Sequence, residues 1–151
     1  MRGVAPSSFP EFDTVAPTYD RYLQPHEHRR RGEDLAAEHS AVEHLRLGES
    51  TDGRPIHARS VGDGTGTALL LGGAHPNEPV GSLTCDAVAH ALAADPDLRE
   101  RLDCEVVIVP VADPDGAVLN RGWFDGPYDL TTYARGWYRP TRRRPTASSP
   151  T

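Results

Sequence analysis

His75 and Glu78 form the one His-x-x-Glu pair in the chain, and their residue types and spacing could hold a divalent metal ion. A neutral imidazole and a carboxylate are suitable zinc ligands, and a catalytic zinc takes about three protein ligands with one open position. Pro76 and Pro79 disfavour helical backbone at the residues just before them, so we expect the loop to turn between the two side chains. The plainer interpretation is that His75 and Glu78 only cap the start of a helix, where a carboxylate is favoured.

The loop between residues 72 and 79 is expected to join a strand to a helix. The apolar run at 68–71 predicts a strand buried on both faces, and apolar residues from 80 to 92 follow helical spacing. A second apolar run at 106–109 predicts another buried strand. A strand, a helix and a strand form a βαβ unit, in which ligands collect at the C-terminal ends of the strands. The pair at 75 and 78 would therefore lie at the ligand-binding edge of a sheet.

The remaining patterns complete the expected architecture. A polar helix is expected over 27–40, and a hairpin with Asp52-Gly53 at its turn precedes the first apolar run. The chain is therefore predicted to have an α/β fold, with a mostly parallel or mixed sheet flanked by helices. Residues 1–17 are expected to form a flexible arm and residues 141–151 a disordered tail, which leaves 18–140 as the folded domain.

Composition and charge exclude several classes of partner. The chain has 151 residues and a net charge of −6, which argues against a nucleic-acid partner. Its longest apolar run, 68–71, is too short to span a membrane, and the N-terminal residues lack the apolar stretch of a secretory signal. We therefore expect a cytoplasmic protein that binds neither nucleic acid nor membrane.

Three motifs occur along the chain in a defined order. Residues 48–55 contain Gly-x-Ser-x-x-Gly-Arg-Pro, residues 72–81 contain the His-Pro-Asn-Glu loop, and residues 109–116 end in Asp-Pro-Asp-Gly. In order and spacing they resemble the N-terminal part of the catalytic domain of the zinc carboxypeptidase family, the carboxypeptidase A-like metallopeptidases. One difference is Asp113, where that family usually has Asn. The resemblance extends over about residues 18 to 140.

The resemblance implies hydrolysis of a peptide bond at a C-terminus, with zinc activating a water molecule. His75 and Glu78 correspond by position to two metal ligands of the family. A second, downstream His would be the third ligand, and a downstream Glu would be the general base. Arginines would bind the terminal carboxylate of the substrate and the developing oxyanion. Arg121 and Arg139 are the candidates for this substrate-binding role, although neither has the expected spacing.

The chain departs from the family pattern at its downstream end. No His follows His90 and no Glu follows Glu105, so the third ligand and the general base are missing from the chain. His90 is excluded as a substitute ligand, because it lies about 14 Å along the helix from the helix start. His44 and His57 fall on the hairpin and are expected to be ordinary surface or hydrogen-bonded histidines. We therefore expect an incomplete catalytic domain, produced by truncation, by a frameshift or as a fragment.

Two further functions stay open at this point. Deacylases of the aspartoacylase and succinylglutamate desuccinylase kind have a similar His-x-Asn-Glu-Pro loop and cleave acyl amino acids, so the substrate is either a peptide or an acyl amino acid. The hairpin-first order and the Asp-Pro-Asp-Gly stretch favour the peptidase. The third hypothesis is a non-catalytic remnant or binding module that keeps the two ligands without turnover.

Overall fold

The sheet in the computed structural model, which describes residues 17–139, has the strand order β1-β2-β4-β3. The strands are β1 (Val42–Glu49), β2 (Pro55–Val61), β3 (Gly66–Leu71) and β4 (Cys104–Val109). β2 pairs antiparallel with both β1 and β4, and β3 pairs parallel with β4. The predicted α/β fold with a mixed sheet is therefore confirmed. The predictions of a tail over 141–151 and, apart from residue 17, of an arm over 1–17 lie outside the described residues.

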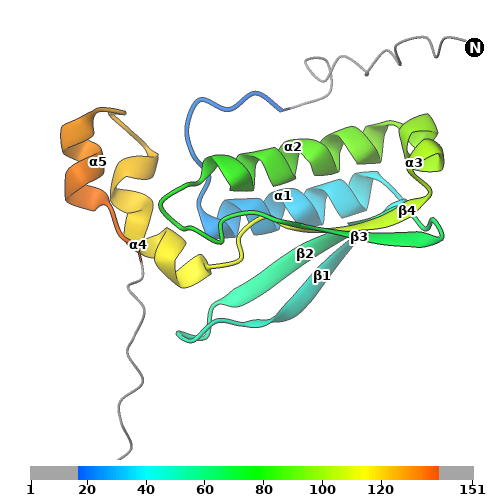
Figure 1. The fold of residues 1–151 in the computed structure, drawn as a ribbon, viewed down its shortest axis with the longest axis horizontal. Helices are drawn as coiled ribbons and strands as arrows, with labels where there is room; N and C mark the ends of the chain where they lie inside the picture. The colour runs from blue at the N-terminus through cyan, green and yellow to red at the C-terminus, as the bar shows by residue number, and fades with distance from the viewer. Residues whose placement is uncertain (1–16, 140–151) are drawn as a thin grey trace, which may run out of the picture.

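The helices gather on one face and at one end of this sheet. They are α1 (Pro25–Glu38), α2 (Val80–Ala94), α3 (Pro96–Leu102), α4 (Pro114–Phe124) and α5 (Leu130–Gly136). α1 and α2 lie side by side on one face of the sheet, and α4 and α5 lie at the end where β3 and β4 finish (Figure 1). The core fills the layer between α1, α2 and the sheet, and its buried members include Leu35, Ala89, Leu92 and Ile108. No helix of the described part of the chain is long and apolar enough to cross a membrane.

Two of the helices start with an aspartate cap followed by proline. The Asp95 side chain accepts a hydrogen bond from Leu98 N at 2.9 Å before α3, and the Asp113 side chain accepts one from Gly116 N at 2.9 Å before α4. Such caps satisfy backbone N–H groups that have no partner inside the helix, and proline at the first helical position costs no hydrogen bond. The Asp-Pro-Asp-Gly motif is therefore also a helix start signal, and α4 begins at its Pro114.

The strand β3 lies at an edge of the sheet, which corrects the prediction that residues 68–71 are buried on both faces. Leu69 and Leu71 are 63% and 55% exposed, whereas Leu70 packs against the core. Among the described strands β3 pairs only with β4, and α1 and α2 cover only one face of the sheet (Figure 1). The apolar run correctly predicted a strand, but its burial depends on neighbouring elements that spacing along the sequence does not reveal.

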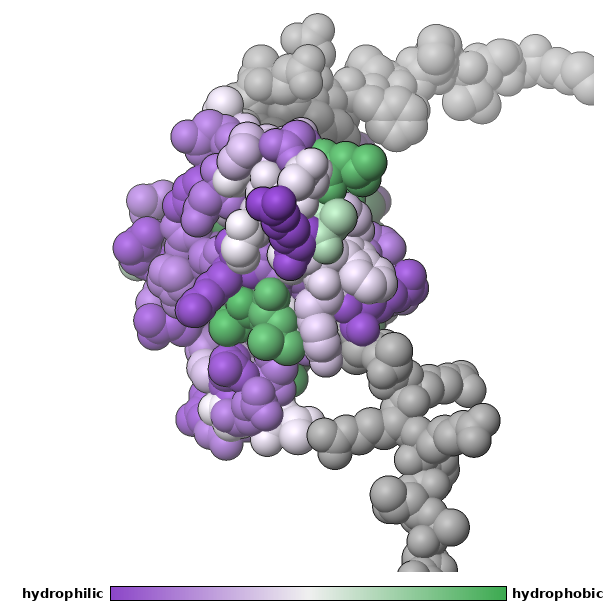
Figure 2. All heavy atoms as spheres, turned by 90° about the vertical axis from the view of Figure 1, so that its left-hand side faces the viewer, coloured by the Kyte–Doolittle hydropathy of each residue, from purple (hydrophilic) through white to green (hydrophobic). Residues whose placement is uncertain are grey.

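An aromatic cluster joins α4 and α5 to the segment before α1. The Trp123 ring lies 5.4 Å from Tyr22 and 4.9 Å from Tyr133, both in edge-to-face arrangements. Tyr22 N also donates to Phe124 O at 3.2 Å, which ties the segment before α1 to α4. Outside this cluster the end of the molecule formed by α4 and α5 is largely hydrophilic, with separate apolar patches on its surface (Figure 2). The aromatic cluster therefore holds α4, α5 and the segment before α1 together, apart from the core between α1, α2 and the sheet.

A buried carboxylate, Asp86, joins the helical layer to the sheet. Its Oδ1 lies 2.5 Å from Arg59 Nη1 on β2, and both side chains are almost completely buried. Its Oδ2 accepts hydrogen bonds from Arg31 Nε on α1 and from the Tyr19 hydroxyl, each at 2.7 Å. Burial alone would raise the pKa of this carboxyl, but Arg59, the Tyr19 hydroxyl and Arg31 together hold it below the ordinary value. Asp86 is therefore charged at neutral pH and ties four segments together.

His28 is a second buried polar side chain in this layer, and it has no such compensation. The residue is 2% exposed, and its two ring nitrogens have no hydrogen-bond partner among residues 17–139. Burial disfavours the imidazolium and lowers the pKa of His28 to about 4. The ring is therefore neutral in the folded chain over most of the acidic range.

Replacing Arg59 with Met should lower the free energy of unfolding by about 3–5 kcal/mol, because Asp86 would then keep a buried charge without its most buried partner. Urea unfolding followed by circular dichroism at neutral pH measures this change. Arg29→Met is the control, since it breaks only the exposed ion pair with Glu33 and should cost less than about 1 kcal/mol. Equal, small losses in the two variants would contradict a structural role for the buried pair.

His28 should make the fold less stable in acid. Below about pH 6.5 the unfolded chain takes up a proton on this residue and the folded chain does not, so stability falls by about 1.4 kcal/mol per pH unit until the folded pKa is reached. With a folded pKa of about 4, the loss attributable to His28 is about 3 kcal/mol in total. Urea unfolding of the wild type and of His28→Leu from neutral pH to pH 4 isolates this contribution, because the other groups titrate in both proteins. Parallel stability curves would refute the assignment.

Candidate metal centre

The loop that carries His75 and Glu78 is fastened to the loop after β4 by backbone hydrogen bonds. Gly72 N donates to Val109 O at 2.8 Å, and Ala112 N donates back to Gly72 O at 2.9 Å. A Cβ on Gly72 would lie 2.7 Å from Gly81 O, and Gly73 has a φ of +60°, so both glycines are required by close packing or by left-handed backbone. The loop therefore has one defined path between β3 and α2.

His75 and Glu78 point to solvent from a loop in which Pro76, Asn77 and Pro79 are buried. Pro76 is fully buried, and Asn77 is 7% exposed with its Nδ2 3.4 Å from the Tyr133 hydroxyl. The two candidate ligands are each 55% exposed, and Glu78 N donates to His75 O at 2.9 Å across the turn. The buried residues hold the backbone, so the two polar side chains converge on the outer side of the loop.

The separation of the two side chains fits a shared metal better than a direct hydrogen bond. His75 Nδ1 lies 3.4 Å from Glu78 Oε2, which is beyond the usual range of about 2.7–3.2 Å for an N–H···O bond. Two ligands bound at about 2.0–2.1 Å to one tetrahedral zinc lie about 3.3 Å from each other. Imidazole nitrogen and carboxylate oxygen are also the donor types that zinc prefers. These two side chains therefore fit two of the ligand positions of a zinc ion.

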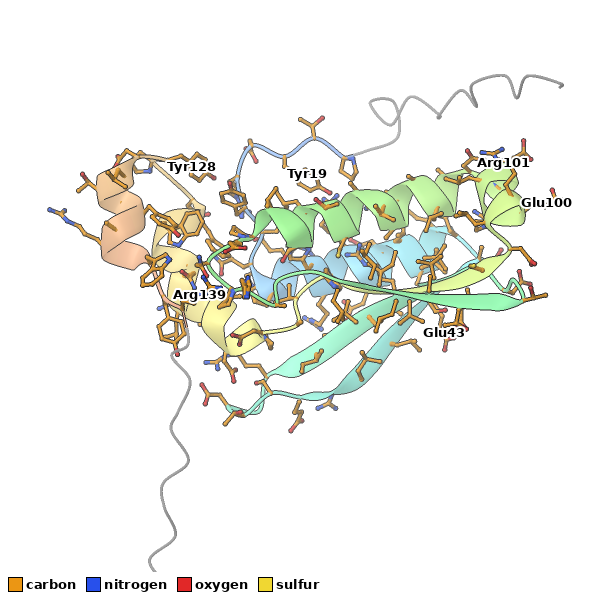
Figure 3. The ribbon with its side chains drawn as sticks, viewed as in Figure 1. Tyr19, Glu43, Glu100, Arg101, Tyr128 and Arg139 are labelled. Carbon is orange, nitrogen blue, oxygen red and sulfur yellow. The ribbon has the colours of Figure 1, made fainter. Side chains whose placement is uncertain are left out.

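Arg139 lies at this pair of side chains, although it follows His75 by 64 residues. Its Nη2 is 3.2 Å from His75 Nε2, the ring nitrogen on the side away from Glu78. Figure 3 shows Arg139 beside the loop that enters α2, close to the start of α4. The structure thus brings together three of the four site residues expected from the sequence, two as candidate ligands and one as a cation beside them.

Arg121, the fourth expected residue, lies elsewhere. It lines a surface hollow between the start of α1, the hairpin and α4, and no residue of the 72–79 loop lines this hollow. The other side chains around it include Arg29, Arg54, His57 and Asp125. Arg121 is therefore separated from His75 in the fold, and its assignment to substrate binding stays a prediction that the geometry does not favour.

No third ligand joins His75 and Glu78 in the described part of the chain. Within residues 17–139 no group of three or more His, Cys, Asp or Glu side chains is placed to hold a metal. His90 lies in the Asp86 cluster, with Nε2 3.9 Å from Asp86 Oδ2, and His44 stacks on His57 at 4.9 Å in the hairpin. Within residues 17–139, His75 and Glu78 are therefore two candidate ligands without a third, and we call this pair the half-site.

The motifs at 48–55 and 109–116 contact each other through Asp115. Its Oδ1 accepts hydrogen bonds from Ser50 Oγ and Arg54 Nη1, each at 2.7 Å, and its Oδ2 accepts one from Asp52 N at 3.1 Å. This fastens the hairpin turn to the first turn of α4. A Cβ on Gly116 would lie 2.4 Å from Pro76 Cγ, so α4 in turn packs closely against the half-site loop. The two motifs therefore support the half-site rather than supply ligands to it.

Asn120 is the residue at this site that sequence reasoning did not identify. It is fully buried in α4, and it bonds to the backbone of Tyr138, the residue before Arg139. The one signal in the sequence is an Asn close to apolar residues in a segment without clear periodicity, which does not reveal a contact 18 residues away.

Comparison with known proteins places this geometry in a family. A family model described as zinc carboxypeptidase matches residues 31–148. No curated protein matches the chain. Among solved structures, bovine thrombin-activatable fibrinolysis inhibitor in complex with tick carboxypeptidase inhibitor is 17% identical, with a TM-score of 0.61 over 70% of this chain and 36% of that chain. Carboxypeptidase A from Helicoverpa armigera is 20% identical, with a TM-score of 0.56 over 74% of this chain and 31% of that chain.

At these identities the solved structures show the fold alone. The chain spans about a third of the length of these carboxypeptidases. The family model, by contrast, covers more than half of the chain, including the half-site loop and Arg139. The chain therefore belongs to the zinc carboxypeptidase family.

Proposed function

We propose that this chain supplies part of the active site of a metallocarboxypeptidase, an enzyme that hydrolyses the C-terminal peptide bond of a peptide. The observation that carries the proposal is the convergence of His75 Nδ1 and Glu78 Oε2 at 3.4 Å, with Arg139 beside them. His75 and Glu78 would hold zinc, and the third ligand and the general base would come from outside these 151 residues. Zinc, when bound, would polarise the scissile carbonyl and activate a water molecule.

Arg139 supports a substrate that carries a negative charge. A guanidinium donates two parallel hydrogen bonds to a carboxylate, and its charge does not depend on pH in the physiological range. At the half-site it would bind the terminal carboxylate of a peptide or the oxyanion that forms during hydrolysis. A guanidinium can only donate, so its contact uses the lone pair of His75 Nε2. Zinc on Nδ1 would leave a proton on Nε2, and the guanidinium would then turn from the ring toward the bound anion.

Acyl amino acids also end in a carboxylate, so a deacylase would use the same three residues. The hairpin turn docked on Asp115 favours the peptidase, since the motif at 48–55 belongs to the carboxypeptidase resemblance. Incubating the zinc-loaded chain with a free-carboxylate dipeptide and with an N-acetyl amino acid separates the two substrates. Hydrolysis of the dipeptide alone would support the peptidase. Binding without hydrolysis of either would support a non-catalytic role for the isolated chain.

Zinc binding tests the metal centre directly. The untagged chain should bind zinc, and His75→Ala and Glu78→Gln should each weaken binding by more than about tenfold, because each removes one of two protein ligands. Competition with a fluorescent zinc chelator measures the affinity. His26→Ala is the matched control, since His26 is exposed on α1 away from the loop and should bind zinc like the wild type. The same affinity in all four proteins would refute the half-site.

Carboxylate recognition tests the role of Arg139. A dipeptide with a free C-terminus should bind the zinc-loaded chain about twofold to fivefold more tightly than its amidated form, since one exposed ion pair contributes up to about 1 kcal/mol. Arg139→Gln should remove this preference, and Arg121→Gln should keep it, because Arg121 lines a different hollow. Titrations followed by nuclear magnetic resonance give the affinities of the three proteins for both dipeptides. Loss of the preference in Arg121→Gln instead would transfer the role to that residue.

A further inference from the structure

Asn120 uses every hydrogen-bonding position of its side chain in a fully buried site on α4. Its Nδ2 donates to Gly116 O at 2.9 Å and to Tyr138 O at 2.8 Å. Its Oδ1 accepts from Tyr138 N at 2.9 Å and from Trp123 Nε1 at 3.1 Å. Two bonds therefore belong to α4 itself, and the other two hold both sides of one residue beyond α5.

The segment that Asn120 holds has little else to fix it. Trp137 is 47% exposed and Tyr138 is 38% exposed, so burial of these aromatic rings contributes little to their placement. Segments of low burial move freely unless hydrogen bonds restrain their backbone. The two bonds from Asn120 to the backbone of Tyr138 are such a restraint, and they act on the residue directly before Arg139.

α4 links this restraint to the half-site. The start of α4 packs against the loop through Gly116 and Pro76, whose contact leaves no room for a Cβ on the glycine. The same helix carries Asn120 one turn further along. The loop with His75 and the backbone before Arg139 are therefore both held in place by α4. This common support accounts for the 3.2 Å distance between Arg139 Nη2 and His75 Nε2.

We propose that Asn120 is a positioning residue that holds the guanidinium of Arg139 at the His75–Glu78 half-site. This inference rests on the proposed function, because it assigns the means by which the anion-binding cation reaches the metal centre. Asn120 itself touches neither ligand in the described contacts. It acts through the backbone of Tyr138.

A cation held beside a metal centre has a measurable consequence. Arg139 would repel a divalent cation bound to His75 Nδ1, and at about 7 Å in a water-like dielectric this repulsion lowers zinc affinity by about fivefold at low salt. Removing the charge should therefore raise zinc affinity. Releasing the backbone before Arg139 should raise it as well, because a mobile guanidinium moves into solvent. A merely structural defect would lower zinc affinity or leave it unchanged.

The test compares zinc affinity in the full chain carrying Asn120→Ser, Arg139→Gln or both. Ser keeps a hydroxyl that can bond to Gly116 O within the helix, but it is too short to reach Tyr138. Arg139→Gln should raise zinc affinity by about fivefold at low salt, and Asn120→Ser should give a large part of that rise. In the Arg139→Gln background Asn120→Ser should have no further effect. Trp123→Phe is the matched control, since it removes the one bond of the Asn120 side chain that comes from another side chain and should leave zinc affinity unchanged.

Hydrogen exchange of the Tyr138 amide gives a second readout that needs no zinc. The amide should be protected in the wild type and in Trp123→Phe and unprotected in Asn120→Ser. An unchanged or lower zinc affinity in folded Asn120→Ser, or a rise that persists without Arg139, would overturn the proposal. If the wild type binds no zinc, the proposed function fails, and the exchange of the Tyr138 amide alone decides whether Asn120 restrains this segment.

Discussion

The buried charge of Asp86 is the constraint on which the arrangement of the helices over the sheet depends. A carboxylate without exposure is tolerated only when its charge is compensated, and the partners here come from β2, α1 and the segment before α1. Each partner has one geometry that satisfies Asp86, so α2 can occupy only one position on the sheet. Apolar packing alone, with Ala89 and Leu92 as its contacts, would allow α2 to slide.

The position of α2 fixes one end of the half-site loop, and β3 fixes the other. The loop between them is held by backbone bonds to the segment after β4 and by its buried side chains, Pro76 and Asn77. His75 and Glu78 therefore need no interaction of their own to stay close together. The buried side chains of the loop stabilise its backbone, and the exposed side chains of His75 and Glu78 stay available to a metal.

Local patterns predicted the parts of this site that local interactions determine. The spacing of His75 and Glu78 and the prolines around them define one turn, and the structure brings those side chains to 3.4 Å. The strands and α2 followed from apolar runs in the same way. The exposure of Leu69 could not be predicted, because it depends on which element lies beside β3. The contact of Arg139 with His75 could not be predicted either. It depends on hydrogen bonds from Asn120 to the backbone of Tyr138, and the sequence around Asn120 shows no clear helical periodicity.

Two of the three motifs that resemble the family, at 48–55 and 109–116, stabilise the fold around the half-site and supply no candidate ligand. Ser50 and Arg54, from the motif at 48–55, donate hydrogen bonds to the carboxylate of Asp115, from the motif at 109–116. A chain can keep these hydrogen bonds and the fold that they stabilise while the residues for turnover are missing, since none of the bonds involves a candidate metal ligand. Family membership thus follows from the scaffold, whereas catalysis requires a third ligand and a base that the sequence after Glu105 does not provide as His or Glu. Under the proposed function, the half-site and Arg139 would be the part of the enzyme's chemistry that this chain supplies, namely weak binding of a metal and of an anion beside it.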